Sequence, residues 1–218
     1  MELRHQLDWL KRTLLDTVTT PFPDALKPDE KAAVAAYLVL AHACIEEAIE
    51  DAFYERAEIL TEILKRHPRP PRMAAFLGYN AALKLPEKKR VTYKKRKLGG
   101  SLLAALETYQ STVVSQNHGI KESNLLALAE GAGVEWENLE SELAVAIADF
   151  GTLGAKRGSV GHLSPFTDKS ALITSQIDKE DVVKWVKEAE KGVEGLLAYL
   201  NKDLVDTGLS YRVTVQRS

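Results

Sequence analysis

The chain has 218 residues, of which 45% are hydrophobic and 28% charged, and its formal net charge is −2. This length can bury a core without a disulfide or a structural metal, and the composition excludes a disordered chain. The single cysteine, Cys44, excludes an internal disulfide and a cysteine-rich zinc site, and its apolar neighbours indicate a small buried residue.

The N-terminal residues do not have the pattern of a signal peptide, because charged residues come early and no apolar run follows them. The chain also lacks an uninterrupted run of about 18 apolar residues, the length that a transmembrane helix needs. Together with the cysteine content, these features favour a cytoplasmic protein without a membrane partner.

The first half of the chain has the apolar spacing of helices, interrupted by prolines. A first helix is expected over 3–18 and ends before Pro21. Pro28, followed by two acidic residues, predicts the start of a long helix that continues to Pro68. A shorter helix is expected over 72–83.

The second half continues the helical pattern, with glycines at the predicted helix ends. Helices are expected over 101–116, 122–130, 135–162 and 179–204, and a short tail over 211–215 alternates like a strand. The sequence therefore predicts an all-α class. We expect a helical bundle with long antiparallel helices and a short C-terminal tail, as a single domain over all 218 residues.

Positive charge is concentrated in the segment 84–97, which is predicted to be a loop. This segment holds eight basic residues and one acid, so the rest of the chain has 21 basic residues against 30 acidic ones. Such a segment is typical of a grip on a nucleic-acid backbone, and Tyr93 could stack on a base. The alternative is a solvated lysine loop.

Four glycines recur in the expected helix over 135–162. Gly151, Gly154, Gly158 and Gly161 are spaced at i, i+3, i+7 and i+10, which places them on one stripe. Each glycine costs a helix about 1 kcal/mol relative to alanine. We therefore expect another backbone to approach the stripe, and a helix of a second copy is the candidate. The alternative is a frayed helix end or a loop.

The segment Arg157-Gly-Ser-Val-Gly-His162 matches the Arg-x4–6-His signature of HEPN domains, at the family's position late in a long helix. Residues 115–162 resemble the RiboL-PSP-HEPN subfamily or its relative, the MAE-type HEPN. The shared order is an Asn-His-Gly-like helix end, a short helix, a glycine turn and the long helix. Glu46, after an apolar residue, resembles the acid of the first core helix. The resemblance covers most of 35–165.

The resemblance implies a metal-independent endoribonuclease without a cofactor, in which the 2′-hydroxyl of the RNA is the nucleophile. Arg157 would stabilise the charged transition state, and His162 would transfer protons. Glu46 and Ser159 are possible supporting residues, and the alternative for Glu46 is a solvated acidic face. The family commonly places Asn or Asp directly after the motif arginine. Here that residue is Gly158.

The resemblance also implies partners. A homodimer would bring two arginines and two histidines around one furrow. The residues expected to bind RNA are Lys88, Lys89, Arg90, Tyr93, Lys94, Lys95, Arg96 and Lys97. A toxin or antiviral effector is the expected role, with an antitoxin or defence-system protein as a possible partner.

The sequence also leaves open a non-catalytic function. The chain could be a non-catalytic HEPN-like module that binds RNA, nucleotide or protein, which Gly158 favours slightly.

The Asn117-His118-Gly119 segment is better explained as the end of a helix than as the position of a catalytic histidine. The sequence indicates no partner for His42.

Overall fold

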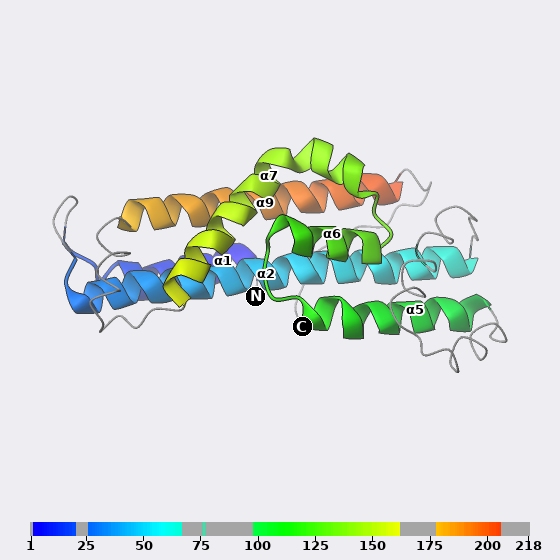
Figure 1. Ribbon diagram of the computed structural model, residues 1–218, viewed down its shortest axis with the longest axis horizontal. Helices are drawn as coiled ribbons and strands as arrows, with labels where there is room; N and C mark the ends of the chain where they lie inside the picture. The colour runs from blue at the N-terminus through cyan, green and yellow to red at the C-terminus, as the bar shows by residue number, and fades with distance from the viewer. Residues whose placement is uncertain (1, 21–25, 67–75, 77–97, 162–177, 206–218) are drawn as a thin grey trace. The chain divides into compact units, whose positions relative to one another are not determined.

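The computed structural model is helical throughout its described secondary structure, which confirms the predicted all-α class (Figure 1). It describes residues 2–20, 26–66, 76, 98–161 and 178–205. The expected helix over 72–83 and the tail over 211–215 lie outside these residues, apart from Phe76, which is helical and buried.

The helix bounds follow the predicted pattern with small shifts. In chain order the elements are α1 (Leu3–Leu10), the π-helical turn η1 (Lys11–Leu15), α2 (Pro28–Arg66), α5 (Leu98–Thr112), the 3₁₀ turn η2 (Val114–Gln116), α6 (Glu122–Gly131), α7 (Trp136–Gly161) and α9 (Lys179–Val205). The expected first helix over 3–18 is α-helical only to Leu10 and ends with the π-helical turn. The glycine-rich stretch is helical up to Gly161, so the alternative of a loop there is wrong.

The chain forms two compact units, and three long helices contribute residues to both. Among the described residues, unit 1 comprises 2–20, 26–49, 145–161 and 178–196, and unit 2 comprises 50–66, 76, 98–144 and 197–205. Helix α7 has a kink beside its division between the units, where Leu143 has the non-helical φ −117° and ψ 22°. The single domain expected from the sequence stays a prediction.

Unit 1 has a core of aliphatic and aromatic side chains from α1, η1, α2, α7 and α9. Its buried members include Leu7, Leu10, Leu15, Val34, Tyr37, Leu38, Ile45, Phe150, Leu153, Val182, Val186 and Val193. The close approach of α7 to α9 requires Gly192, because a Cβ there would lie 2.8 Å from Cζ of Phe150. A larger residue at this position would displace the ring or separate the two helices.

Glu30 ties the segment after η1 to the start of α2 in unit 1. Its carboxylate accepts hydrogen bonds from the backbone N–H groups of Thr19, Thr20 and Lys27 at 2.8, 3.0 and 3.1 Å, and from both threonine hydroxyls. The Thr20 hydroxyl bond, followed by the N–H groups of Lys27 and Thr19, lowers the pKa of Glu30 to about 2. The buried carboxylate is therefore stabilised in its charged form.

Glu30→Gln is expected to lower Tm at neutral pH and to have less effect in acid. The folded-state pKa of Glu30 lies below its ordinary value of 4.5, so the carboxylate stabilises the fold above pH 4.5. This contribution is lost as the pH falls from 4.5 toward 2. The Tm difference between wild type and variant should therefore shrink between about pH 7 and pH 3. The same difference at both pH values would contradict this, and Asp29→Asn, at the exposed neighbour, is the control.

Helix α6 in unit 2 ends at a glycine, as the sequence predicts. Gly133 has a φ of 73°, which favours glycine. Its N–H donates to the carbonyl of Glu130 at 3.0 Å, and the N–H of Val134 donates to the carbonyl of Ala129 at 2.9 Å. These two bonds form a Schellman motif, which satisfies the last carbonyl groups of the helix.

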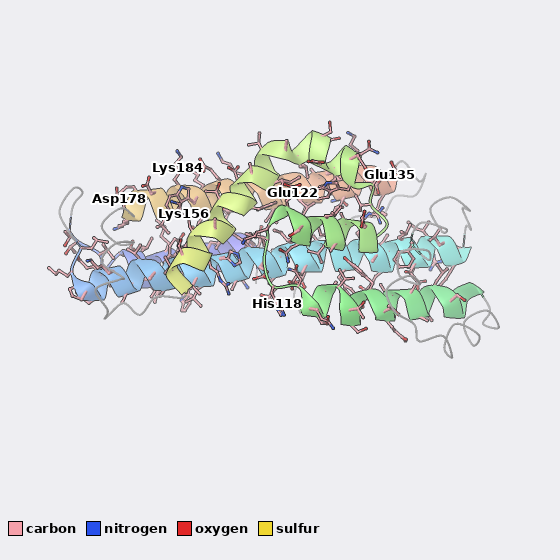
Figure 2. All side chains as sticks on the ribbon, in the orientation of Figure 1. His118, Glu122, Glu135, Lys156, Asp178 and Lys184 are labelled. Carbon is pink, nitrogen blue, oxygen red and sulfur yellow. The ribbon has the colours of Figure 1, made fainter. Side chains whose placement is uncertain are left out.

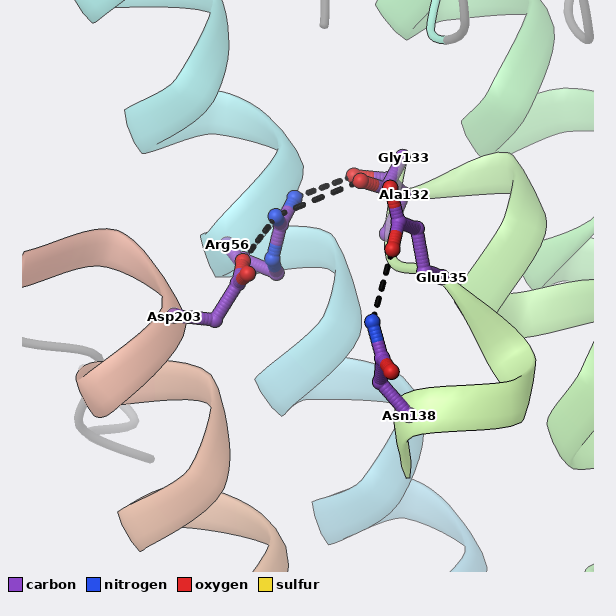
Figure 3. A network of polar contacts seen from close by, with 6 residues as sticks. All are labelled: Arg56, Ala132, Gly133, Glu135, Asn138 and Asp203. Carbon is purple, nitrogen blue, oxygen red and sulfur yellow. Dashed lines mark hydrogen bonds and ion pairs between the residues drawn. The ribbon is translucent and has the colours of Figure 1, made fainter. Parts of the chain in front are cut away.

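Arg56 of α2 is fully buried and binds the same helix end in unit 2 (Figure 3). Its guanidinium donates to the carbonyl oxygens of Ala132 and Gly133, the second at 3.4 Å, and forms an ion pair with Asp203 of α9. Carbonyl groups at a helix C-terminus carry partial negative charge, so a cation there is favourable. Arg56 therefore joins three segments of unit 2 through charge-assisted hydrogen bonds.

Helix α2 is long and apolar enough to cross a membrane by length and composition, with a mean hydropathy of 1.6 over an 18-residue window. This criterion uses length and composition alone, so the expectation that no segment spans a membrane stays a prediction. A buried core helix meets the same criterion, and 44% of this window is buried inside the protein. Cys44 on this helix is partly exposed, so its prediction as a small buried core residue is wrong.

Candidate active site

Arg157 lies on the second half of α7 in unit 1, and it is exposed. This half of α7 crosses the first half of α2, which belongs to the same unit (Figure 1). The residues between the motif arginine and Gly161 are helical, and His162 directly follows them. His162 lies outside the described residues, so its position relative to Arg157 stays a prediction.

The first half of α2 carries a buried histidine beside a carboxylate. His42 is 2% exposed, and its Nδ1 lies 3.5 Å from Oε2 of Glu46, whose side chain is 18% exposed. The two residues are spaced at i and i+4, so they are neighbours on one face of the helix. The structure therefore places the predicted supporting residue Glu46 next to a histidine.

The positive charge of Arg157 acts on this pair. Burial, followed by the charge of Arg157, lowers the pKa of His42 to about 4. His42 is therefore neutral near pH 7 and has one ring N–H. The carboxylate of Glu46 favours the tautomer with this hydrogen on Nδ1. The contact thus places a neutral N–H beside a carboxylate, and the charge of Arg157 acts on the histidine.

Sequence reasoning missed His42 and left the environment of Glu46 open. The i, i+4 spacing of a histidine and a glutamate was the available signal, but this spacing is common on solvated helices. Burial distinguishes this pair, because Glu46 is mostly buried rather than part of a solvated acidic face. Asp51, further along α2 in unit 2, is also partly buried, and burial raises its pKa.

The predicted glycine stripe does not contact a second backbone where its surroundings are described. A Cβ added at Gly151 or Gly158 would meet no atom within 4 Å, so both face open space. Gly154 is buried, and the surroundings of Gly161 lie outside the described residues. At Gly151 and Gly158 no neighbouring backbone approaches within this chain, and the predicted approach of a helix from a second copy stays a prediction.

Ser159 is exposed, and its hydroxyl is bound to its own helix. It donates toward the carbonyl oxygens of Lys156 at 2.9 Å and Ala155 at 3.1 Å. Such bonds to the preceding turn are common for helical serine and need no ligand. A supporting role of Ser159 in catalysis would require this hydroxyl to leave the helix backbone.

Lys156, labelled in Figure 2, precedes the motif arginine on α7 and lies beside an aromatic ring of α9 in unit 1. Its Nζ lies 4.7 Å from the centre of the Trp185 ring, a cation–π contact. Lys156 and Arg157 are therefore adjacent cations in different environments. The ammonium group of Lys156 lies over the Trp185 ring, whereas the exposed Arg157 is available to an anion.

The residues predicted to grip RNA lie outside the described residues. They are Lys88, Lys89, Arg90, Tyr93, Lys94, Lys95, Arg96 and Lys97. The choice between an RNA-binding segment and a solvated loop is therefore still open, and RNA binding there stays a prediction.

His118 is exposed in unit 2, beside a hydrogen-bonded asparagine (Figure 2). The side-chain N–H₂ of Asn117 donates to Oε1 of Glu50 at 2.7 Å and to the carbonyl of Gly119 at 2.9 Å. Its amide oxygen accepts from Asn124 at 3.0 Å. Asn117 therefore fixes the connection between η2 and α6, which agrees with the interpretation of this segment as a helix end.

No metal site can be built from the part of the chain that the structure describes. Within it, no three His, Cys, Asp or Glu side chains lie close enough together to hold an ion. The expectation of a cofactor-free protein stays a prediction.

The fold and the exposed motif arginine define an all-α helical protein of the HEPN type. The model of the family described as RiboL-PSP-HEPN matches residues 5–202, a longer stretch than the resemblance over 35–165. The chain belongs to this family. Neither the curated proteins nor the solved structures give a significant match. Membership associates the chain with ribonuclease or nucleotide-related functions.

Proposed function

We propose that this protein is a metal-independent endoribonuclease that acts as a homodimer. The observation that carries the proposal is the exposed Arg157 of a family-defining motif, held near the buried His42–Glu46 pair in unit 1. Arginine is permanently charged, and its planar fork fits phosphate oxygens in two-point contacts. An exposed guanidinium anchored by a rigid helix can therefore stabilise negative charge on a phosphate during cleavage.

The proposed reaction is a transesterification within the RNA. The 2′-oxygen loses its proton to a base and attacks the adjacent phosphorus. The bond from phosphorus to the 5′-oxygen breaks, and that oxygen takes up a proton. The products are a 2′,3′-cyclic phosphate and a 5′-hydroxyl. His162 is the proposed proton carrier, because the ordinary pKa of histidine, about 6.5, suits both accepting and giving a proton.

A second copy would supply the second proton-transfer group. The outward face of α7 in unit 1 supports this, because its exposed residues are uncharged apart from Arg157: Val145, Ala148, Thr152, Ala155 and Ser159. Val145 is 77% exposed, and two glycines face open space beside this row. Such a face suits close packing of a helix from a second copy. A chain that stays monomeric in sedimentation equilibrium yet cleaves RNA would contradict the dimer.

The basic segment is the proposed grip on the RNA backbone. Its eight basic residues contrast with the acidic remainder of the chain. Release of counterions makes such binding fall steeply with salt. RNA affinity that does not change between low and high salt would exclude this role.

A non-catalytic RNA-binding or nucleotide-binding function is the second candidate. It is favoured by Gly158, which stands where the family commonly has a polar residue and which faces open space here. RNA binding without cleavage would identify this alternative. Cleavage products therefore distinguish the two candidate functions, whereas RNA affinity does not.

Incubation of purified protein with total RNA in excess EDTA is expected to give cleavage with cyclic phosphate ends. His162→Ala should abolish cleavage because it removes the proposed proton carrier, and it should leave the circular dichroism spectrum and the oligomeric state unchanged. The exposed His118→Ala variant is the matched control and should cleave like wild type. Equal cleavage by wild type and His162→Ala would defeat the catalytic assignment.

The cellular role follows from this activity. A ribonuclease that acts on cellular RNA would stop growth, which is the behaviour of a toxin or an antiviral effector. We infer a cytoplasmic site of action, where RNA is accessible, and an antitoxin or defence-system protein as the partner. Expression of wild type should then arrest growth of the host, and expression of His162→Ala should not.

A further inference from the structure

A groove in unit 1 is lined mainly by lysine. It lies between η1 and the N-terminal half of α9 and has a volume of about 400 Å³. Its charged members are two glutamates, Glu180 and Glu188, and five lysines, Lys11, Lys179, Lys184, Lys187 and Lys191. Outside the basic segment 84–97 the chain has 30 acidic residues against 21 basic ones. The groove therefore reverses the charge balance that holds outside that segment.

Three of the groove lysines form no ion pair in the part of the chain that the structure describes. They are Lys11 from η1 and Lys187 and Lys191 from α9, and all three are exposed. The other two contact a backbone carbonyl group at 3.1 Å and a groove glutamate at 4.0 Å. Lys187 and Lys191 are spaced at i and i+4, so their like charges repel each other on one face of the helix. An anion bound in the groove would relieve this repulsion.

The lysines of α9 form a row along the helix. Lys184, Lys187 and Lys191 recur at i, i+3 and i+7, which is one stripe of the helix surface, and Lys184 is labelled in Figure 2. At 1.5 Å per residue the row is about 10 Å long. Lys11 adds a positive charge on the other wall of the groove. A row of separate charges suits a linear polyanion better than a single phosphate group.

The inner surface of the groove is mostly apolar, with Val183 among its lining residues. Lysine stems add to such a surface while their ammonium groups stay in water. Ribose and base surfaces can therefore lie in the groove while the ammonium groups bind phosphate oxygens as point charges. Two-point binding of carboxylates commonly uses arginine, which is absent from the described lining. The groove thus fits a single-stranded RNA backbone better than an acidic peptide.

Helix α9 also contacts the part of α7 that carries the arginine motif. Lys156 lies over the Trp185 ring, and Gly192 gives the Phe150 ring room to approach. Trp185 and Gly192 each directly follow a lysine of the row, so they lie about 100° around α9 from it. The lysine row and the motif-bearing part of α7 therefore adjoin neighbouring faces of one helix.

We propose that the lysine groove of unit 1 binds the phosphate backbone of single-stranded RNA beside the segment that is cleaved. The proposal deepens the proposed ribonuclease function and rests on it, because the groove holds a neighbouring stretch of the same substrate. Its lysines bind phosphates that do not react. They therefore contribute to RNA affinity and not to the chemical step.

The test is the binding of a fluorescent 2′-O-methyl oligouridylate by the full chain. This RNA cannot undergo the proposed reaction, because its 2′-oxygen carries a methyl group in place of the proton. Lys11→Gln, Lys187→Gln and Lys191→Gln combined should lower its affinity at least about 10-fold at low salt. The slope of log affinity against log salt concentration should become less steep by about 2, since each phosphate contact to a single strand contributes about 0.7.

Two control variants separate the groove from positive charge in general. Lys27→Gln, Lys121→Gln and Lys202→Gln combined remove the same charge from exposed positions elsewhere on the chain. This variant should bind the RNA within about 2-fold of wild type, because salt screens distant exposed charges. Arginine at the three groove positions keeps the charge and should also bind within about 2-fold. Circular dichroism confirms that each variant folds.

A kinetic measurement distinguishes the groove from the catalytic proposal. On a cleavable RNA, the groove variant with three glutamines should raise KM about 10-fold and keep kcat within about 2-fold. If wild type cleaves no RNA, the proposed function fails, while the binding measurement still decides whether the groove holds RNA.

Three results would overturn the proposal: an unchanged RNA affinity in the groove variant, an equal loss in the control variant, or binding of polyglutamate that is as tight as that of RNA and is lost in the groove variant. The last result would assign the groove to an acidic protein partner.

Discussion

Arg157→Ala is expected to lower the rate of RNA cleavage at least about 100-fold, the usual effect of removing one group that stabilises transition-state charge. The residue is exposed, so its loss leaves the core intact and Tm should change little. The measurement is kcat on a short RNA with a single cleavage site. Arg157→Lys should recover only part of the rate, because lysine keeps the charge but not the planar fork.

Lys156→Ala is the matched control for this prediction. It removes a cation from the preceding position of α7, but this cation lies over the Trp185 ring. Its cleavage rate should stay within a few fold of wild type. Loss of activity in both Lys156→Ala and Arg157→Ala to the same extent would reject a specific role for Arg157.

Arg157→Ala should also raise the pKa of His42, because the Arg157 charge is one cause of its low value.

Arg56→Met should destabilise the protein by about 3 kcal/mol, the usual cost of removing one partner of a buried ion pair. Methionine fills much of the volume, so the loss comes from the carboxylate of Asp203 and the carbonyl groups of Ala132 and Gly133, which lose their donor. Equilibrium unfolding in urea measures the change. The midpoint should fall without a change in its slope.

Lys202→Met is the control for this stability prediction. Lys202 pairs with Glu142 at 2.8 Å in the same unit, but both side chains are largely exposed. Exposed ion pairs contribute about 0–1 kcal/mol. If both variants lose the same free energy of unfolding, the buried Arg56 interactions contribute no more to stability than the exposed Lys202–Glu142 pair.

The sequence predicted the helices well because their signals are local. Pro28 with its acidic neighbours begins α2, and Gly133, directly after the C-cap of α6, has the conformation that favours glycine. The end of the first helix was less predictable. Apolar spacing continues to Val18, but the backbone changes to a π-helical turn at Lys11. The Leu143 kink and the two units also have no local signal that we recognise.

The candidate site was only partly predictable. The arginine motif and Glu46 are recognisable through the order of elements that this family shares. The match over residues 5–202 shows the family, and the roles of these residues stay predictions. His42 and Arg56 were not recognisable, because no pattern within α2 distinguishes a buried polar residue from a solvated one. The partners of Arg56 come from the end of α6 and from α9, which are distant in sequence.

The sequence by itself determined the helical class, the ends of several helices and the family, because each depends on residue spacing within a short segment. Only the tertiary structure decided that Arg157 lies near the buried His42–Glu46 pair and that Arg56 binds the end of α6. The physical reason is that the burial of a residue and the charges that act on it depend on its neighbours in space, which come from distant parts of the sequence. The pKa of His42 depends on a cation from another helix, and no pattern within α2 contains that cation.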